Sequence, residues 1–123
     1  MAGKPDLWNP AGMSKQERDK VGNGIRNEYR WLDSEIENLY REFDKLTKKS
    51  PAIQITNLAL QNVNAAISDA KAFLSGDKSV DRITEFVAAG ENPVNSDVLL
   101  VLSKLRAALR RLEATWARFW GPL

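Results

Sequence analysis

The residues that could carry acid–base or metal chemistry are two carboxylates on one predicted helix. Asp33 and Glu37 are four positions apart, a spacing that places both on one helical face. Bundles that bind two metals use several Glu-x-x-Glu or Glu-x-x-His pairs that point inward, and this sequence has neither. Arg30 and Arg41 share the side of these carboxylates, so we expect ion pairs rather than a metal site.

The composition removes most other catalytic machinery. None of the 123 residues is Cys or His, which excludes disulfides, thiolate ligands and every Ser–His or Cys–His nucleophile pair. No glycine-rich phosphate loop follows a predicted strand. We therefore expect a protein that is not an enzyme and that has no cofactor, metal or small-molecule substrate.

A charge-free segment is the first candidate for a partner surface. No charged residue occurs between Ser50 and Ser68, and one half of the helix predicted there is built of amides and hydroxyls. Such a face is either a plain solvent face, a surface covered by the 1–13 arm, or a protein interface where amides pair without the desolvation cost of charges. Trp31 lies beside the core stripe of the preceding helix, where a partner, Trp8 or a short helix of the same chain could cover it. The candidate interface comprises Trp31, Gln54, Asn57, Gln61 and Asn64.

Basic residues gather in the last predicted helix after its first residue, Asp97, and Glu113 is the single acid among them. If these residues contact phosphates, they would support nucleic-acid binding, with Trp116 or Trp120 stacking on the bases. Alternatively they pair with Asp33, Glu35 and Glu37 of the same chain. The candidate nucleic-acid contacts are Lys104, Arg106, Arg110, Arg111 and Arg118.

The elements that must position these side chains are helical. After an extended arm over residues 1–13, Ser14 and Glu17 form a capping box that predicts a helix start, with a break or kink near Gly22 and Gly24. Apolar residues then recur at spacings of four and three up to Lys48 and Lys49, which suit a helix end.

Three further helices follow in the sequence. Ser50 and Pro51 predict the N-cap and first residue of a second helix that closes before Gly76. A short helix is predicted over residues 79–89 with Gly90 as its stop, and a last helix runs from Asp97 to Trp120 before Gly121 and Pro122. Three main helices of about 24 residues, each about 36 Å long, match as rods of one bundle.

The sequence thus predicts an all-α protein: an antiparallel bundle of three long helices and one short helix over residues 14–123, with an extended N-terminal arm over residues 1–13. The net charge is only +2, no apolar stretch is long enough to cross a membrane, and no secretory pattern occurs, so a cytoplasmic location is expected. The favoured function is protein–protein interaction or assembly, as a small subunit or a homo-oligomer. A nucleic-acid-binding helical subunit and an inhibitor or immunity-type binding protein are the alternatives.

Overall fold

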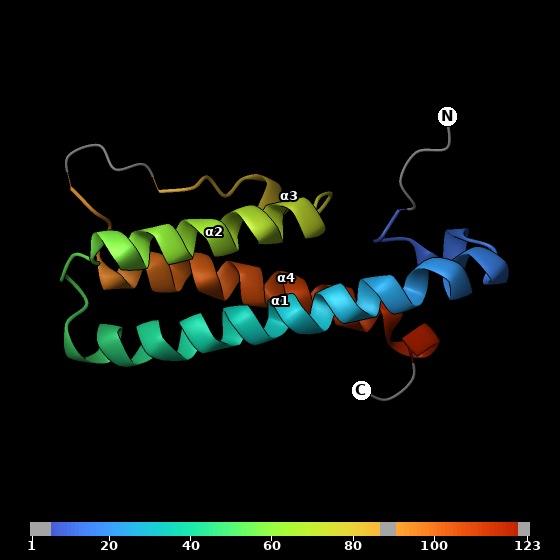
Figure 1. Cartoon of the computed structure of the whole chain (residues 1–123), viewed down its shortest axis with the longest axis horizontal. Helices are drawn as coiled ribbons and strands as arrows, with labels where there is room; N and C mark the ends of the chain where they lie inside the picture. Colours follow the sequence, from blue (N-terminus) through green and yellow to red (C-terminus); the bar gives the residue numbers. More distant parts are fainter. Residues whose placement is uncertain (1–5, 87–90, 121–123) are drawn as a thin grey trace.

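The computed structural model describes residues 6–86 and 91–120, and this part of the chain is helical without a β-strand (Figure 1). A 3-10 turn, η1 (Pro10–Gly12), lies within the arm. The α-helices are α1 (Lys15–Lys49), α2 (Asn57–Phe73), α3 (Lys78–Asp81) and α4 (Asn95–Trp120). The predicted bundle of three long helices and one short helix is confirmed.

The helices do not all alternate in direction. Figure 1 shows α1 running opposite to both α2 and α4, while α2 and α4 run the same way. The connection through α3 crosses back along the bundle, so that Asn95 at the start of α4 donates from Nδ2 to the carbonyl of Ser50 at the end of α1, at 2.9 Å. α1 and α4 therefore form the main packed pair, and α2 lies beside them.

The core lies between the three long helices. Ile36 of α1, Ile67 of α2 and Leu109 of α4 are all fully buried, and Trp116 is only 1% exposed. These residues belong to apolar stripes at spacings of three and four, which is why amphipathic helices of this sequence pack together. The sequence periodicity predicted the stripes correctly except at two apolar positions, Leu46 and Ile53, which are 39% and 59% exposed.

α1 is continuous through Gly22 and Gly24, so the helix does not break where a break or kink was predicted. A glycine in a helix costs about 1 kcal/mol relative to alanine. Gly22 is buried, and a Cβ at this position would lie 3.5 Å from Cζ3 of Trp116. The packing of α1 on the end of α4 outweighs the weak helical propensity, so the helix runs on.

The predicted start of the second helix is also wrong. Ser50 is the C-cap of α1, and α2 begins only at Asn57 with Thr56 as its N-cap. The intervening segment pairs its backbone with the segment before α4: Ile55 N donates to the carbonyl of Pro93 at 2.9 Å, and Gln54 and Val94 form an isolated antiparallel bridge. These long-range bonds hold the segment in extended form.

The remaining differences concern α3 and the ends of α4. α3 spans four residues with Asp77 as its N-cap, so the helix predicted over residues 79–89 is correct at residues 79–81 and wrong at residues 82–86. Its predicted end at residues 87–90 lies outside the described residues. α4 begins at Asn95, two residues before the predicted Asp97. Gly121 and Pro122, the predicted stop, also lie outside the described residues.

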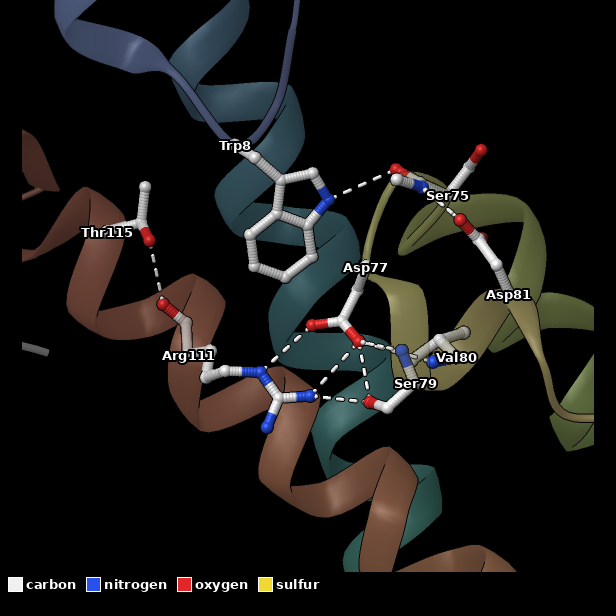
Figure 2. Close-up of polar contacts among 9 residues, drawn as sticks. Trp8, Ser75, Asp77, Ser79, Val80, Asp81, Arg111 and Thr115 are labelled. Atoms are coloured by element: carbon white, nitrogen blue, oxygen red, sulfur yellow. Dashed lines mark hydrogen bonds and ion pairs between the residues drawn. The ribbon is translucent and has the colours of Figure 1, made fainter.

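The arm is anchored on the bundle. Trp116 donates from Nε1 to the carbonyl of Leu7 at 2.8 Å, and Met13 is buried in the core. Trp8 donates from Nε1 to the carbonyl of Ser75 at 3.1 Å (Figure 2). Residues 6–13 are thus tied to both α4 and the end of α2.

Candidate functional site

Trp31 is one of the most exposed large apolar residues of the described chain. Its side chain is 59% exposed. It lines a small pocket of 110 Å³ between α1 and α2, together with Asp69, Ala72 and Phe73. Trp8, the alternative cover for Trp31, lies instead beside Gly76. Trp31 therefore presents its ring to solvent at the junction of the two helices.

An uncompensated acidic pair lies next to Trp31. Burial raises the pKa of Glu35, and the charge of Asp69 raises it further. Oε2 of Glu35 is buried without a hydrogen-bond partner, and neither Glu35 nor Asp69 takes part in an ion pair among the described residues. The expected pairing of Glu35 with the arginines of the last helix is therefore wrong, because Glu35 faces α2 rather than α4.

The antiparallel pairing of α1 with α2 continues this surface along both helices. Glu35 lies opposite Asp69; eleven positions further along α1 and eleven back along α2 lie Leu46 and Leu58. These leucines are 39% and 69% exposed. We call this surface the α1–α2 face; its residues are Trp31, Glu35, Asn38, Glu42 and Leu46 from α1, with Leu58, Asn62, Ala65, Asp69 and Ala72 from α2.

The predicted amide residues lie away from the α1–α2 face. Asn57, Gln61 and Asn64 line a different pocket, of 390 Å³, whose other wall is Phe86. Asn64 bonds to the backbone of Phe86 at both ends of its amide, and Asn57 Oδ1 accepts from Asn92 Nδ2 at 2.8 Å. Asn57 and Asn64 thus bind residues of the segment that connects α3 to α4.

The other two amides are exposed, but they too are separated from Trp31. Gln61 lies on the outer side of α2. Gln54 lies before α2, in the bridge to Val94. The structure therefore does not bring the five predicted interface residues together on one surface. The α1–α2 face contains Trp31 but none of the four amides.

Two of the predicted nucleic-acid contacts are bound to α1. Arg106 donates to Glu37, and Arg110 lies 3.1 Å from Glu37, 3.3 Å from Asp33 and 3.1 Å from Glu113. Partial burial pushes the pKa of Glu37 upward, but the hydrogen bond and charge of Arg106 outweigh it and lower this pKa. Burial dominates at Asp33 and raises its pKa despite Arg110. Arg106 and Arg110 therefore act as links between α1 and α4.

Arg111 is engaged on the opposite side of α4. Its Nε and Nη2 donate to the two oxygens of Asp77 at 2.9 and 3.1 Å, and Nη2 also donates to Ser79 Oγ at 2.8 Å (Figure 2). Partial burial raises the pKa of Asp77, but the bonds from Arg111, Ser79 and the backbone of Val80 lower it to about 2. Arg111 keeps 48% of its side chain exposed.

The basic residues also share an exposed surface with apolar ones. Leu100, which is 57% exposed, lies on the side of α4 that is turned away from the core. We call this side the outer face of α4; its residues, all exposed, are Leu100, Lys104, Ala107, Arg111, Ala114 and Arg118. They recur at spacings of four and three, so they form one straight stripe. Lys104 and Arg118 form no ion pair among the described residues.

Sequence reasoning missed Leu58, Asp69 and Leu100. The signal for Leu100 was available, because it lies opposite the core stripe of the last helix. The roles of Leu58 and Asp69 depend on which side of α2 meets α1, and the sequence of α2 alone does not carry that information.

Within residues 6–86 and 91–120, no group of three or more acidic residues is placed to hold a metal ion. In the same part of the chain, none of the helices combines the length and the apolar character needed to cross a membrane. Comparisons of the chain with protein-family models, with curated proteins and with solved structures found no match.

Proposed function

We propose that this protein is a non-catalytic assembly protein whose copies join head to tail. The α1–α2 face of one copy contacts the outer face of α4 of the next. The observation that carries this proposal is the complementarity of the two exposed stripes: one is apolar and acidic, and the other is apolar and basic.

The charges of the two faces are opposite and well separated. The α1–α2 face contains Glu35, Glu42 and Asp69 and no basic residue. The outer face of α4 contains Lys104, Arg111 and Arg118, of which Arg111 is already paired with Asp77. Opposite potentials steer two proteins together and fix the register in which they dock. A basic residue near Glu35 would also relieve its unpaired, partly buried charge.

Both faces also offer apolar anchors. Trp31 and Leu58 are 59% and 69% exposed on one face, and Leu100 is 57% exposed on the other. Tryptophan dominates the energetics of many interfaces because it buries a large rigid surface. From Trp31 to Leu46 the α1–α2 face extends about 22 Å, and from Leu100 to Arg118 the outer face of α4 extends about 27 Å, at 1.5 Å per residue. The outer face of α4 is therefore long enough to cover the α1–α2 face.

Because the two faces differ, each copy has one of each to offer. Such a heterologous contact produces rings when the rotation closes and open chains when it does not. A symmetric dimer does not use this pair of faces. This distinction gives the proposal a sharp test.

The experiment uses two variants that each lack one face. Trp31→Ala with Leu58→Ser removes the anchors of the α1–α2 face, and Leu100→Glu with Lys104→Glu makes the outer face of α4 acidic. All four side chains are exposed, so both variants retain the core. Lys20→Glu, an exposed residue outside both faces, is the matched control.

The masses are measured by sedimentation velocity from about 1 μM to about 1 mM, a range that covers the dissociation constants of weak assemblies. The wild type and the Lys20 variant are expected to assemble with increasing concentration, and each face variant to remain monomeric. An equimolar mixture of the two face variants is expected to stop at a dimer, because it has only one intact pair of faces. A wild type that stays monomeric, or face variants that assemble like it, would overturn the proposal.

A further inference from the structure

The charged residues of α1 follow a regular order beside Trp31. Four of them are seven positions apart and therefore lie on one side of the helix: Glu28, Glu35, Glu42 and Lys49. Glu28 lines the same pocket as Trp31, so this row of charges follows the α1–α2 face and continues past both of its ends. None of the four forms an ion pair among the described residues. From the start of α1, the row has three negative charges and then one positive charge.

The outer face of α4 has a row with the same spacing. Its charges are exposed and also lie seven positions apart: Asp97, Lys104, Arg111 and Arg118. From the start of α4, this row has one negative charge and then three positive charges. Within the described chain, Arg111 alone among them forms an ion pair, through Nε and Nη2 on Asp77, and its Nη1 donates to no described residue (Figure 2). Arg111 therefore keeps a donor for a second carboxylate.

The order of the signs distinguishes the directions in which the two helices can meet. In an antiparallel arrangement with Leu100 opposite Leu46, every charge of one row meets a charge of opposite sign in the other. The four pairs are Glu28 with Arg118, Glu35 with Arg111, Glu42 with Lys104, and Lys49 with Asp97. Displacement of this arrangement by seven residues in either direction places two charges of like sign opposite each other, which disfavours the displaced registers.

Parallel arrangements fit less well. With Glu35 opposite Lys104, charges of like sign meet at both ends of the rows. With Glu35 opposite Arg111, these like-charge pairs disappear, but α4 ends before it reaches Leu46. Unfavourable contacts in the wrong arrangement are a general source of specificity. The like-charge pairs of the first parallel arrangement are Glu28 with Asp97 and Lys49 with Arg118.

Apolar contacts support the same antiparallel register. Leu46 and Leu58 lie opposite each other in α1 and α2, and Leu100 of the next copy would lie against both. At the other end of the face, Trp31 falls beside Ala114 of the next copy, whose small side chain leaves space for the indole ring. The two rows of charges are each about 32 Å long at 1.5 Å per residue. Charges and apolar anchors are therefore satisfied by one arrangement.

The partly buried carboxylate of Glu35 has a suitable partner in this register. Burial raises the pKa of Glu35, and the charge of Asp69 raises it further. Arg111 of the next copy would lie against Glu35 and Asp69 together, with Nη1 available to donate. A guanidinium beside two carboxylates favours their ionised forms, so this contact would offset the repulsion between the two acids.

We propose that α4 of one copy docks on the α1–α2 face of the next with α4 antiparallel to α1, in the register that pairs Glu42 with Lys104. The register rests on the head-to-tail assembly proposed above and gives that assembly a direction. Within one chain α1 and α4 are antiparallel (Figure 1), so the α1 helices of successive copies run the same way. All copies of the assembly therefore point in one direction.

Exchange of charges between the two helices tests the register. Lys104→Glu and Glu42→Lys, each alone, place like charges opposite each other and are expected to weaken assembly by about tenfold or more. Both changes in one chain restore the pair with reversed signs, and this double variant is expected to assemble within about threefold of wild type. Both residues are exposed, so the substitutions leave the core intact. Sedimentation velocity measures the affinities.

Two further double variants are the matched controls, because they change the charge by the same amount. Glu35→Lys with Lys104→Glu, and Glu28→Lys with Lys104→Glu, match the two parallel arrangements, and neither is expected to recover wild-type assembly. Recovery by either control, or no recovery by the variant at Glu42 and Lys104, would overturn the register while the assembly itself stands. A wild type that remains monomeric would overturn the assembly and the register together.

Cross-linking gives a readout that does not depend on charge reversal. The sequence contains no cysteine, so one thiol can be placed in each chain. In a mixture of Lys49→Cys and Asp97→Cys chains, an intermolecular disulfide is expected to form at least about tenfold faster than in a mixture of Lys49→Cys and Arg118→Cys chains, because a disulfide requires closely spaced Cβ atoms. Equal rates, or a faster reaction in the second mixture, would overturn the antiparallel direction.

Discussion

Asn64 and Phe86 are joined by two hydrogen bonds that use both ends of one side-chain amide. The N–H of Phe86 donates to Oδ1 of Asn64 at 2.8 Å, and Nδ2 of Asn64 donates to the carbonyl of Phe86 at 2.7 Å. The arrangement resembles the paired hydrogen bonds between two β-strands. The backbone N–H and carbonyl of Phe86 therefore both have partners, although Phe86 belongs to no strand. An amide that looked available for a partner is therefore part of the fold.

Replacement of Asn64 by Ala is expected to lower the free energy of unfolding by about 1 to 3 kcal/mol, because both backbone groups of Phe86 lose their partner. Gln61→Ala, at an exposed neighbour that lines the same pocket, is expected to change it by less than about 0.5 kcal/mol. Urea denaturation measures both values, and hydrogen exchange at the amide of Phe86 is expected to accelerate only in the Asn64 variant. Equal effects of the two substitutions would contradict this role.

Tyr29 joins α1 to α4 through its hydroxyl, which donates to Glu113 and accepts from Arg110 at 2.9 Å. Burial raises the pKa of Tyr29 above its usual range, and the hydrogen bond to Glu113 raises it further. Tyr29→Phe is expected to destabilise the protein by about 1 to 2 kcal/mol in urea denaturation, because Arg110 and Glu113 lose a buried partner.

Tyr40→Phe is the matched control, because the hydroxyl of Tyr40 forms no hydrogen bond among the described residues. It is expected to cost less than about 0.5 kcal/mol. In a spectrophotometric titration at high pH, the wild-type chain is expected to show one tyrosine that ionises only with unfolding. Ionisation of Tyr29 while the protein is still folded would refute the assignment.

Two glycines are expected to respond in opposite ways to replacement by alanine. Gly24 lies inside α1, and a Cβ there meets no atom within 4 Å, so Gly24→Ala is expected to stabilise the protein by about 0.5 to 1 kcal/mol. Gly76 has a φ of +103°, and a Cβ would lie 3.1 Å from Cδ1 of Trp8. Gly76→Ala is therefore expected to destabilise by about 1 to 3 kcal/mol. Thermal unfolding distinguishes the two signs, and a change of the same sign in both would be evidence against these environments.

The lowered pKa of Asp77 predicts a specific dependence on pH. Its pKa falls from 3.8 to about 2 on folding, so its ionised form is favoured in the native state. The resulting stability is present above about pH 4 and is lost as the pH falls from about 4 toward about 2. Asp77→Asn is expected to cost about 1 to 2 kcal/mol at pH 7, with a difference from wild type that shrinks in this window.

The measurement is the free energy of unfolding at several pH values. Arg111→Gln is expected to remove most of the same pH dependence, because Arg111 donates two hydrogen bonds to Asp77. A difference between wild type and the Asp77 variant that stays constant from pH 7 to pH 2 would be incompatible with this account.

Local periodicity predicted the helical faces well because each stripe is a property of one segment. Leu102, Leu105, Leu109 and Leu112 are fully buried where the spacing placed them. The ends of helices depended on distant partners instead. Ser50 and Pro51 have the form of a helix start, but Asn95, far along the chain, binds the carbonyl of Ser50 and the segment remains extended.

In the candidate sites, too, some features follow from local periodicity and others depend on partners far along the chain. The angle of Trp31 on the helix placed it beside the core stripe, but the cover by Trp8 or a short helix of the same chain that the sequence allowed does not occur, and Trp31 is 59% exposed. The engagement of Asn64 and Arg111 was not predictable, because their partners Phe86 and Asp77 belong to a segment that the sequence assigned to a helix or a loop. The close contact of Gly22 with Trp116 was missed, since the two glycines were interpreted as a break or kink rather than as a place where α1 packs on α4.

The pairing of α1 with α4 has a consequence for how the chain is made. Trp116 is bonded to Leu7 across 109 positions, and Arg110 to Tyr29 across 81. On the ribosome α4 is the last of the described helices to be synthesised, so the apolar stripe of α1 has no main partner until then. The nascent chain therefore exposes that stripe through most of translation and acquires its core only when the final helix emerges.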